Sequence, residues 1–196
     1  MIQDIFKVPI YEYKLNLDTK ALTEFCNEYK NDKGSRVANE GTWLTASGWQ
    51  SPDLPLELPA IKSLINKIEG HSSNFASSII NNNMQFVINM WMNINEFKEG
   101  NRTHCHPHSD ISGVYYVKTP ENCGRITLEH PLKQTLDFAD TPAKVQNFNE
   151  YNSPEWWLPP VEDTLYLFPS WLNHFVEPNM NTTTERISIS FNTRDR

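Results

Sequence analysis

The sequence predicts an α+β fold in which helices pack on one face of a rolled antiparallel β-sandwich. Two segments with helical periodicity come early in the chain, and after residues 81–83 the pattern changes to the period of two that is typical of strands. The chain has 196 residues, of which 38% are hydrophobic and 21% charged, so one globular domain over residues 1–196 is expected. Within it, residues 1–83 should support a β-core formed by residues 84–196.

The first part of the chain predicts one strand and two helices. Residues 5–11 have the pattern of a strand. Asp18 and Thr19 can cap a helix that continues to about Tyr29 and stops within residues 31–34. A second helix is predicted from about Leu58 to Ile79, with a weak stretch at residues 70–73 that could break it. Both helices carry an apolar stripe, formed by Ala21, Leu22, Phe25 and Tyr29 in the first and by Ile61, Leu64, Ile65 and Ile68 in the second.

The second part of the chain predicts a series of strands separated by turn residues. The strands are expected at residues 85–97, 111–119, 125–129, 164–168, 175–176 and 186–193. Turns rich in Gly, Pro and Asn separate them at residues 98–101, 120–124 and 177–179. Residues 131–160 form a long irregular stretch, and long loops in a small domain usually have a function such as covering a substrate.

Composition and charge exclude several classes of function. The net charge of −7 argues against nucleic acid as the main partner, because phosphate binding requires clustered Lys and Arg. No apolar run is long enough to span a membrane, and the first residues lack the features of a signal peptide. The three cysteines, Cys26, Cys105 and Cys123, favour free thiols in a reducing cytoplasm. A homodimer is left open, since no coiled-coil repeat reports on the oligomeric state.

A cluster of histidines is the main candidate for chemistry. Residues 103–110 contain three of the six histidines of the chain, and His174 follows about seventy residues later. On an extended strand, His104 and His106 point to the same face and can bind one metal ion. His174 can join them if a second strand end returns to the same place. A lone histidine is usually a surface residue, but this arrangement favours a metal site.

The remaining polar residues of this segment leave the ligand set open. Cys105 should point to the face opposite the two neighbouring histidines. His108 and Asp110 form a literal HxD sequence, yet they look like part of the turn after the strand. Iron sites that activate oxygen commonly combine two histidines with one carboxylate. Asp110 could therefore be a ligand, or it could orient an imidazole from outside the metal sphere.

The last predicted strand places an arginine where an anion could meet it. Arg186, Ser188 and Ser190 alternate with apolar residues and share one face. If this face points into the barrel, the guanidinium requires an anion, and a dicarboxylate could bind it by two hydrogen bonds. If the face is exposed to solvent, Arg186 is an ordinary surface charge. The histidine cluster favours the first interpretation.

Taken together, these motifs resemble a known family. The chain is similar to the 2-oxoglutarate/Fe(II)-dependent oxygenases of the prolyl-hydroxylase-like superfamily, and most of all to an uncharacterised subgroup found in bacteria and phages. The resemblance covers roughly residues 85–193. It rests on the segments Trp91-Met92-Asn93, His104-x-His106-Pro107, Ser112-Gly113-Val114-Tyr115-Tyr116-Val117, Phe168-Pro169-Ser170-Trp171-Leu172-x-His174 and Glu185-Arg186-Ile187-Ser188-x-Ser190-Phe191-Asn192.

The resemblance implies a double-stranded β-helix, or cupin-like jelly-roll, that holds Fe(II) and the co-substrate 2-oxoglutarate. His104 and His174 match iron ligands, and His106 stands where the family usually has Asp, so the implied metal ligands are His104, His106 and His174. Arg186 and Ser188 match the pair that binds the distal carboxylate of 2-oxoglutarate. Tyr116 matches a tyrosine whose hydroxyl group binds the same carboxylate. Trp156, Trp157 and Trp171 are candidates for the pocket wall, with ordinary core packing as the alternative.

The expected function is that of a dioxygenase that uses molecular oxygen, hydroxylates a small-molecule or peptidyl substrate, and releases succinate and CO2. One alternative is a cupin-like metal-dependent dioxygenase or isomerase that does not use 2-oxoglutarate, since sites with three histidines suit that chemistry. It would leave Arg186 and Ser188 unexplained. Another alternative is a non-catalytic jelly-roll that binds a ligand. The residues do not identify the substrate.

Overall fold

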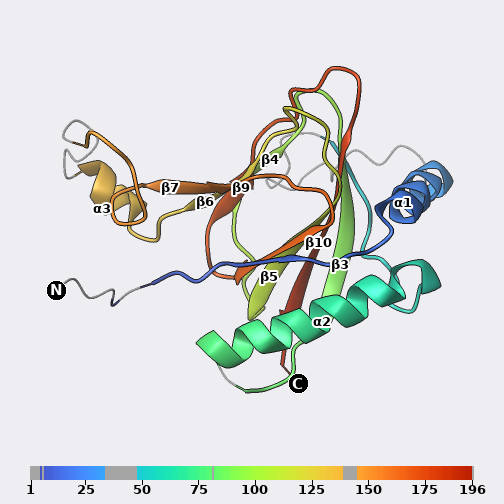
Figure 1. The fold of residues 1–196 in the computed structure, drawn as a ribbon, viewed down its shortest axis with the longest axis horizontal. Coiled ribbons are helices and arrows are strands. Elements are labelled where there is room, and N and C mark those ends of the chain that lie inside the picture. Colours follow the sequence, from blue (N-terminus) through green and yellow to red (C-terminus); the bar gives the residue numbers. More distant parts are fainter. Residues whose placement is uncertain (1–4, 6, 34–47, 81, 139–144, 196) are drawn as a thin grey trace.

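Two antiparallel sheets face each other and form the body of the molecule (Figure 1). The computed structural model describes residues 5, 7–33, 48–80, 82–138 and 145–195. The six-stranded sheet has the order β1 (Tyr11–Lys14), β8 (Thr164–Pro169), β5 (Ile111–Lys118), β10 (Arg186–Arg194), β3 (Phe86–Asn95) and β2 (Trp49–Gln50). The four-stranded sheet has the order β4 (Asn101–His104), β9 (His174–Val176), β6 (Ile126–Glu129) and β7 (Glu155–Leu158). This arrangement confirms the predicted jelly-roll core.

The two long helices cover the outer face of the six-stranded sheet, as the sequence predicts. Helix α1 (Thr19–Lys33) and helix α2 (Pro59–Ile79) bury their apolar stripes against alternate residues of β3, β5, β8 and β10. Helix α3 (Lys133–Phe138) lies beside the β6–β7 hairpin, away from that layer (Figure 1). The main apolar core therefore lies between sheet and helices, and a smaller apolar cluster lies between the two sheets, which it shares with polar residues.

The last strand shows how the molecule separates these two environments. Ile187, Ile189 and Phe191 belong to the core against the helices and are completely buried. Arg186 and Ser188, on the other face of β10, are also buried, at 0% and 6% exposure. Because both faces are buried, the interpretation of Arg186 as a surface charge is wrong, and the inward-facing interpretation is confirmed.

The helices agree with the sequence except at one point. Asp18 caps α1 as predicted, since its Oδ1 accepts a hydrogen bond from the Ala21 amide at 3.0 Å. Helix α1 continues to Lys33, four residues beyond the predicted Tyr29, and Gly34 lies outside the described residues. The possible break at residues 70–73 is absent from α2. Ser72, Phe75 and Ala76 extend the buried stripe through that turn, so tertiary packing outweighs the weak local propensity.

The predicted strands of the core are present as β3, β5, β6, β8, β9 and β10, with ends shifted by one or two residues. The expected strand at residues 5–11 is wrong in position, because β1 begins at Tyr11 and pairs with β8 through Lys14. Pro9 lacks the amide hydrogen that a paired strand needs, and Phe6 lies outside the described residues. Short elements that the sequence did not predict are β2, β7 and α3. The extended strand expected at the histidines is present as β4, which ends at His104, so His106 lies beyond its end.

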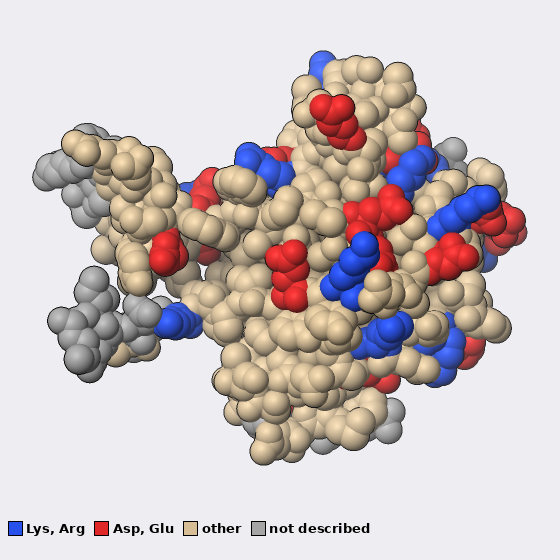
Figure 2. Space-filling view, in the orientation of Figure 1, with Lys and Arg blue, Asp and Glu red and all other residues tan. Residues whose placement is uncertain are grey.

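The surface shows no concentration of basic charge on the face drawn in Figure 2, where Lys and Arg are interspersed with Asp and Glu. That mixture agrees with the net charge of −7. Among the described residues, no helix combines the length and the apolar character that crossing a membrane requires.

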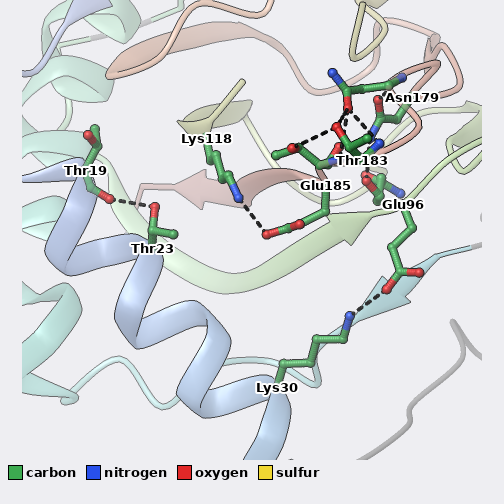
Figure 3. A network of polar contacts seen from close by, with 11 residues as sticks. Thr19, Thr23, Lys30, Glu96, Lys118, Asn179, Thr183 and Glu185 are labelled. Carbon is green, nitrogen blue, oxygen red and sulfur yellow. Dashed lines mark hydrogen bonds and ion pairs between the residues drawn. The ribbon is translucent and has the colours of Figure 1, made fainter. Parts of the chain in front are cut away.

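A buried asparagine orders the end of the molecule where β3, β9 and β10 meet. Asn179 is completely buried, and its Nδ2 donates to the carbonyl oxygens of Asn95 and Thr184 at 2.9 and 3.0 Å. Nearby ion pairs join Lys118 of β5 to Glu185 and Lys30 of α1 to Glu96 (Figure 3). These contacts hold the start of β10, and therefore Arg186, against the end of β3.

Two glycines provide a test of the packing. A Cβ on Gly113, in β5, would lie 2.7 Å from the Tyr166 carbonyl oxygen, so we expect Gly113→Ala to lower the free energy of unfolding by about 2–3 kcal/mol. Gly70, in the middle of α2, has no atom within 4 Å of such a Cβ, so Gly70→Ala should stabilise the protein by about 0.5–1 kcal/mol. Urea denaturation measures both values, and equal effects of the two substitutions would contradict this packing.

Candidate metal centre

Three histidines meet where β4 and β9 lie side by side. His104 ends β4 and His174 begins β9, and the two are directly paired across the sheet. His106 follows two residues after β4. The ring centroids are 4.4 Å apart for His104 and His174, 4.9 Å for His104 and His106, and 5.2 Å for His106 and His174. One nitrogen from each imidazole lies within 4.8 Å of the others, which is close enough for the three to bind one metal ion.

The turn after His106 is fixed by backbone hydrogen bonds to the neighbouring strands. The His106 amide donates to the Ser170 carbonyl at 2.9 Å, and the Ser170 amide donates to the Asp110 carbonyl at 3.2 Å. His108 has a φ of 70°, which is the left-handed conformation of a turn residue. The chain therefore passes His106 along the end of β8 before it returns as β5.

Backbone carbonyls determine which imidazole nitrogen is available to a metal. Nδ1 of His104 lies 2.7 Å from the Arg102 carbonyl oxygen, and Nδ1 of His174 lies 2.9 Å from the Leu172 carbonyl oxygen. Since a carbonyl oxygen can only accept, each Nδ1 carries the hydrogen and each Nε2 keeps its lone pair. Nε2 is thus the atom that these two histidines offer to an ion.

Burial keeps these imidazoles neutral. Desolvation, together with a smaller effect of the neighbouring His104, lowers the pKa of His174 to about 3 and that of His106 to about 4. Desolvation also lowers the pKa of His104 itself, although its hydrogen bond to the Arg102 carbonyl acts in the opposite direction. Neutral imidazoles are the form that binds metal ions, so the cluster requires no deprotonation at neutral pH.

The other polar residues of the segment lie outside the cluster. The Asp110 carboxylate accepts hydrogen bonds from the Gln85 amide group at 3.2 Å and from the Asp195 backbone amide at 3.0 Å. His108 is exposed, and Cys105 is a free cysteine that does not belong to the group of possible ligands. Orientation of the imidazoles by Asp110 is therefore not found, because the carbonyls of Arg102 and Leu172 have that role.

Arg186 carries a buried positive charge without a matching negative one. Its Nη1 donates to the carbonyl oxygens of Cys123, Gly124 and Glu177, and its Nη2 donates to Asn95 Oδ1 at 2.9 Å. Nε is buried and has no hydrogen-bond partner. Among the described residues no carboxylate forms an ion pair with Arg186, since the nearby Glu177 carboxylate is held by Arg125. Desolvation lowers the pKa of Arg186, as expected for a cation that is only partly compensated.

Two of the three predicted co-substrate residues, Ser188 and Tyr116, line the same cavity as the histidines, whereas Arg186 is not among its lining residues. Ser188 of β10 lies directly opposite Tyr116 of β5, so both side chains point to the interior. Desolvation raises the pKa of Tyr116, so its hydroxyl stays protonated at neutral pH. The cavity measures about 40 Å³, and its described lining residues contain no Asp or Glu. They are Trp91, Asn93, Asn95, Asn101, His104, His106, Gly113, Val114, Tyr116, Ile126, Phe168, His174, Val176, Ser188 and Ser190.

The residues that line the cavity differ in part from those predicted from the sequence. Trp91 and Asn93 alternate along β3 and line the cavity, with the Trp91 ring 5.6 Å from that of His106. The sequence marked both residues only through the segment Trp91-Met92-Asn93 of the family resemblance, without a role in the site. Trp156, Trp157 and Trp171 do not line this cavity, nor are they core residues, because they are 48%, 53% and 56% exposed.

Comparison with known proteins gives one family and one fold. Residues 89–192 match the family model described as "Putative 2OG-Fe(II) oxygenase". Similar solved structures include a Pseudomonas putida prolyl-4-hydroxylase, with 12% identity, a TM-score of 0.64, and coverage of 96% of this chain and 94% of that one. HygX from Streptomyces hygroscopicus, solved with nickel and 2-oxoglutarate, has 9% identity, a TM-score of 0.62, and coverage of 96% and 83%.

A viral collagen prolyl hydroxylase from Paramecium Bursaria Chlorella virus-1, in complex with 2-oxoglutarate, has 13% identity, a TM-score of 0.60, and coverage of 95% of this chain and 96% of that one. At these identities the structural similarity establishes the fold alone. No curated protein matches the sequence.

The lowered pKa values predict acid sensitivity of the metal-free protein. Below the ordinary histidine pKa of 6.5, the unfolded chain binds a proton that buried His174, with a pKa of about 3, does not bind. Stability should therefore fall with decreasing pH, by about 1.4 kcal/mol per pH unit for this residue between pH 6 and 4. His174→Asn should remove that part of the slope when the free energy of unfolding is measured in the presence of a chelator. His108→Asn, which changes an exposed imidazole, is the control, and an equal slope in both variants would be contrary to expectation.

Proposed function

Because the chain belongs to the 2OG-Fe(II) oxygenase family, whose members are oxidoreductases that use Fe(II) and 2-oxoglutarate, we propose that it hydroxylates a substrate. In the proposed reaction, one atom of O2 enters a C–H bond of the substrate. The other atom enters the carboxylate of succinate, as 2-oxoglutarate loses CO2. The charge distribution around Arg186 is the observation that supports this function most directly.

The burial of Arg186 supports the binding of an anion, because none of the described residues pairs its charge. A guanidinium that is completely buried is costly unless it is paired, and four neutral oxygen acceptors compensate it only partly. The free Nε hydrogen adds an unused donor. A carboxylate of 2-oxoglutarate would compensate the positive charge and accept a hydrogen bond from Nε. Ser188 and Tyr116 would add two hydroxyl donors from adjacent strands.

The histidine cluster would hold the iron. His104, His106 and His174 offer three neutral nitrogens, a donor type that suits iron, and they leave further coordination positions open. Bound iron would supply the redox chemistry with O2. The carbonyls of Arg102 and Leu172 would keep two of the rings in the orientation that metal binding needs.

The absence of a carboxylate ligand gives 2-oxoglutarate a larger electrostatic role. His106 occupies the position at which the resembled family usually has Asp, and no Asp or Glu is among the described cavity residues. The two negative charges of 2-oxoglutarate would therefore compensate both the metal and Arg186. Binding of the metal and of 2-oxoglutarate should consequently reinforce each other.

A second candidate function follows from the same histidines. A site of three imidazoles also suits a metal-dependent dioxygenase or isomerase that does not use 2-oxoglutarate. That function would leave the charge of Arg186 without a partner. Formation of succinate in step with oxygen consumption distinguishes the two, because only the first function produces it.

Substitution of His106 tests the metal ligands. We expect His106→Ala to weaken Fe(II) binding by more than about 100-fold, since changes outside the first sphere already cost 10- to 100-fold. Anaerobic titration with elemental analysis of bound iron measures the effect. Cys105→Ala is a matched control, because Cys105 is adjacent in sequence but outside the cluster. Wild-type iron content in His106→Ala would disprove its role as a ligand.

Substitution of Tyr116 tests the co-substrate site. Truncation of Arg186 would leave the carbonyls of Cys123 and Gly124 without a donor and would disturb the fold, so a milder change is preferable. Tyr116→Phe should raise the KM for 2-oxoglutarate by about 10- to 100-fold, the effect of one hydrogen bond to a charged group. Tyr115→Phe is the control, because the Tyr115 hydroxyl binds Asp163 on the other face of the strand. An unchanged KM in Tyr116→Phe would contradict the proposed binding mode.

A further inference from the structure

A second and larger hollow lies beside the histidine site. This cleft measures about 600 Å³, which is within the range of small-molecule sites. Its described walls come from residues 5–10, the β6–β7 hairpin and residues 150–153. In Figure 2 the surface is hollowed between the part that carries β7 and α3 and the N-terminal segment. Leu172 completes the lining, and it is the one residue among those that line the cleft to which a role near the metal is assigned above.

The strand register connects this cleft with the histidines. His104 is paired with His174, His174 with Leu128, and Leu128 with Trp156. Directly opposed residues of antiparallel strands point to the same face, so these four side chains form one row across the inner face of the four-stranded sheet. Neighbouring strands lie about 4.8 Å apart, which places Trp156 roughly 10 Å from His174 along the row. Leu128 and Trp156 line the cleft.

Part of the cleft lining is apolar and buried. Leu128 and Leu172 are 4% and 2% exposed, and both belong to the apolar cluster between the two sheets. Val8 and Ile10 pack against the same cluster from the N-terminal segment. Leu172 also accepts the hydrogen bond from His174 Nδ1, so one short segment forms part of the cleft and orients an imidazole.

The rim carries more carboxylates than ammonium groups. Glu129, Glu150 and Glu155 line the cleft, together with Lys7. The Lys133 ammonium holds the Glu129 and Glu155 carboxylates together and thereby joins α3 to the hairpin. An anionic ligand would meet repulsion here, whereas an uncharged apolar ligand would gain contact with Trp156 and the leucines.

We propose that this cleft is the substrate site and that it takes an uncharged, largely apolar small molecule. The proposal rests on the function proposed above, since the row of side chains runs from Trp156 and Leu128 in the cleft to the histidines that would hold iron. Trp156 is a specificity-determining residue that contacts the apolar body of the substrate. Trp157, its neighbour in sequence, points to the opposite face and stacks on Arg125, with Cζ 4.6 Å from the ring centroid.

A neutral fluorescent probe tests the cleft without any metal. N-phenyl-1-naphthylamine should bind the metal-free, full-length protein at one saturable site, and Trp156→Ala should weaken its binding about tenfold. Trp157→Ala is the matched control, because the two rings are similarly exposed, at 48% and 53%. Circular dichroism verifies that both variants fold. The absence of saturable binding, or equal losses in the two variants, would overturn the assignment of the cleft.

The charge of the ligand is tested by a matched pair of probes. 8-Anilino-1-naphthalenesulfonate has the ring system of the neutral probe plus one sulfonate. We expect it to bind several-fold more weakly because of the glutamates at the rim. Equal or tighter binding of the sulfonate would overturn the assignment to an uncharged ligand.

The distance between the ligand in the cleft and the iron is tested by nuclear magnetic resonance. Fe(II), added anaerobically, should broaden or shift the proton signals of the bound neutral probe, whereas diamagnetic Zn(II) should not. If Fe(II) binds but leaves the probe signals unchanged, the cleft is separate from the metal centre, and this inference fails while the proposed function stands. If no metal binds, the proposed function fails, and the fluorescence titrations still decide whether the cleft is a binding site.

Discussion

The buried guanidinium of Arg186 is the constraint on which the arrangement of the interior depends. The jelly-roll places it at the start of β10, inside the space between two sheets, where water cannot stabilise it. The chain supplies three carbonyl oxygens and one side-chain oxygen as acceptors but no carboxylate among its described residues. Removing a cation from water is only partly compensated by neutral acceptors. The free protein therefore retains an unfavourable electrostatic energy that a bound dianion would relieve.

This constraint explains why both faces of the last strand are buried. An ordinary sandwich strand alternates between core and solvent, but β10 alternates between an apolar core and a polar interior. The six-stranded sheet is stabilised from the outside by the helices, through residues such as Ile189 and Phe191. Apolar packing on the outer face can then offset the cost of burying Arg186 on the inner face. Helices α1 and α2 are thus indirect parts of the site.

The sequence predicts those features that depend on local periodicity. The alternation around Arg186, and the spacing of His104 and His106, require only that the strands be extended. The return of His174 to the same place depends on pairing between β4 and β9, two strands of four and three residues, and the sequence pattern does not show which strands pair. The carbonyls that orient the imidazoles could not be predicted either, because any residue type can supply them. Of the three tryptophans expected in a pocket wall or in the core, Trp156 lines the larger cleft, whereas Trp157 and Trp171 line neither cavity and are exposed, a difference that a strand pattern does not show.

The short strands around the metal centre need a fixed register, because a slip of one residue would turn His174 outward and Phe175 inward. Contacts at both ends of the β6–β9 pair prevent such a slip. At one end the Glu129 amide donates to the Asn173 carbonyl at 2.8 Å. At the other end Arg125 donates to both carboxylate oxygens of Glu177, which lowers the pKa of that carboxyl. Gly124, with a φ of +80°, permits the close approach to Glu177 that this contact needs. The same register sets the row from His104 to Trp156, so these contacts position the metal ligands and the wall of the cleft together.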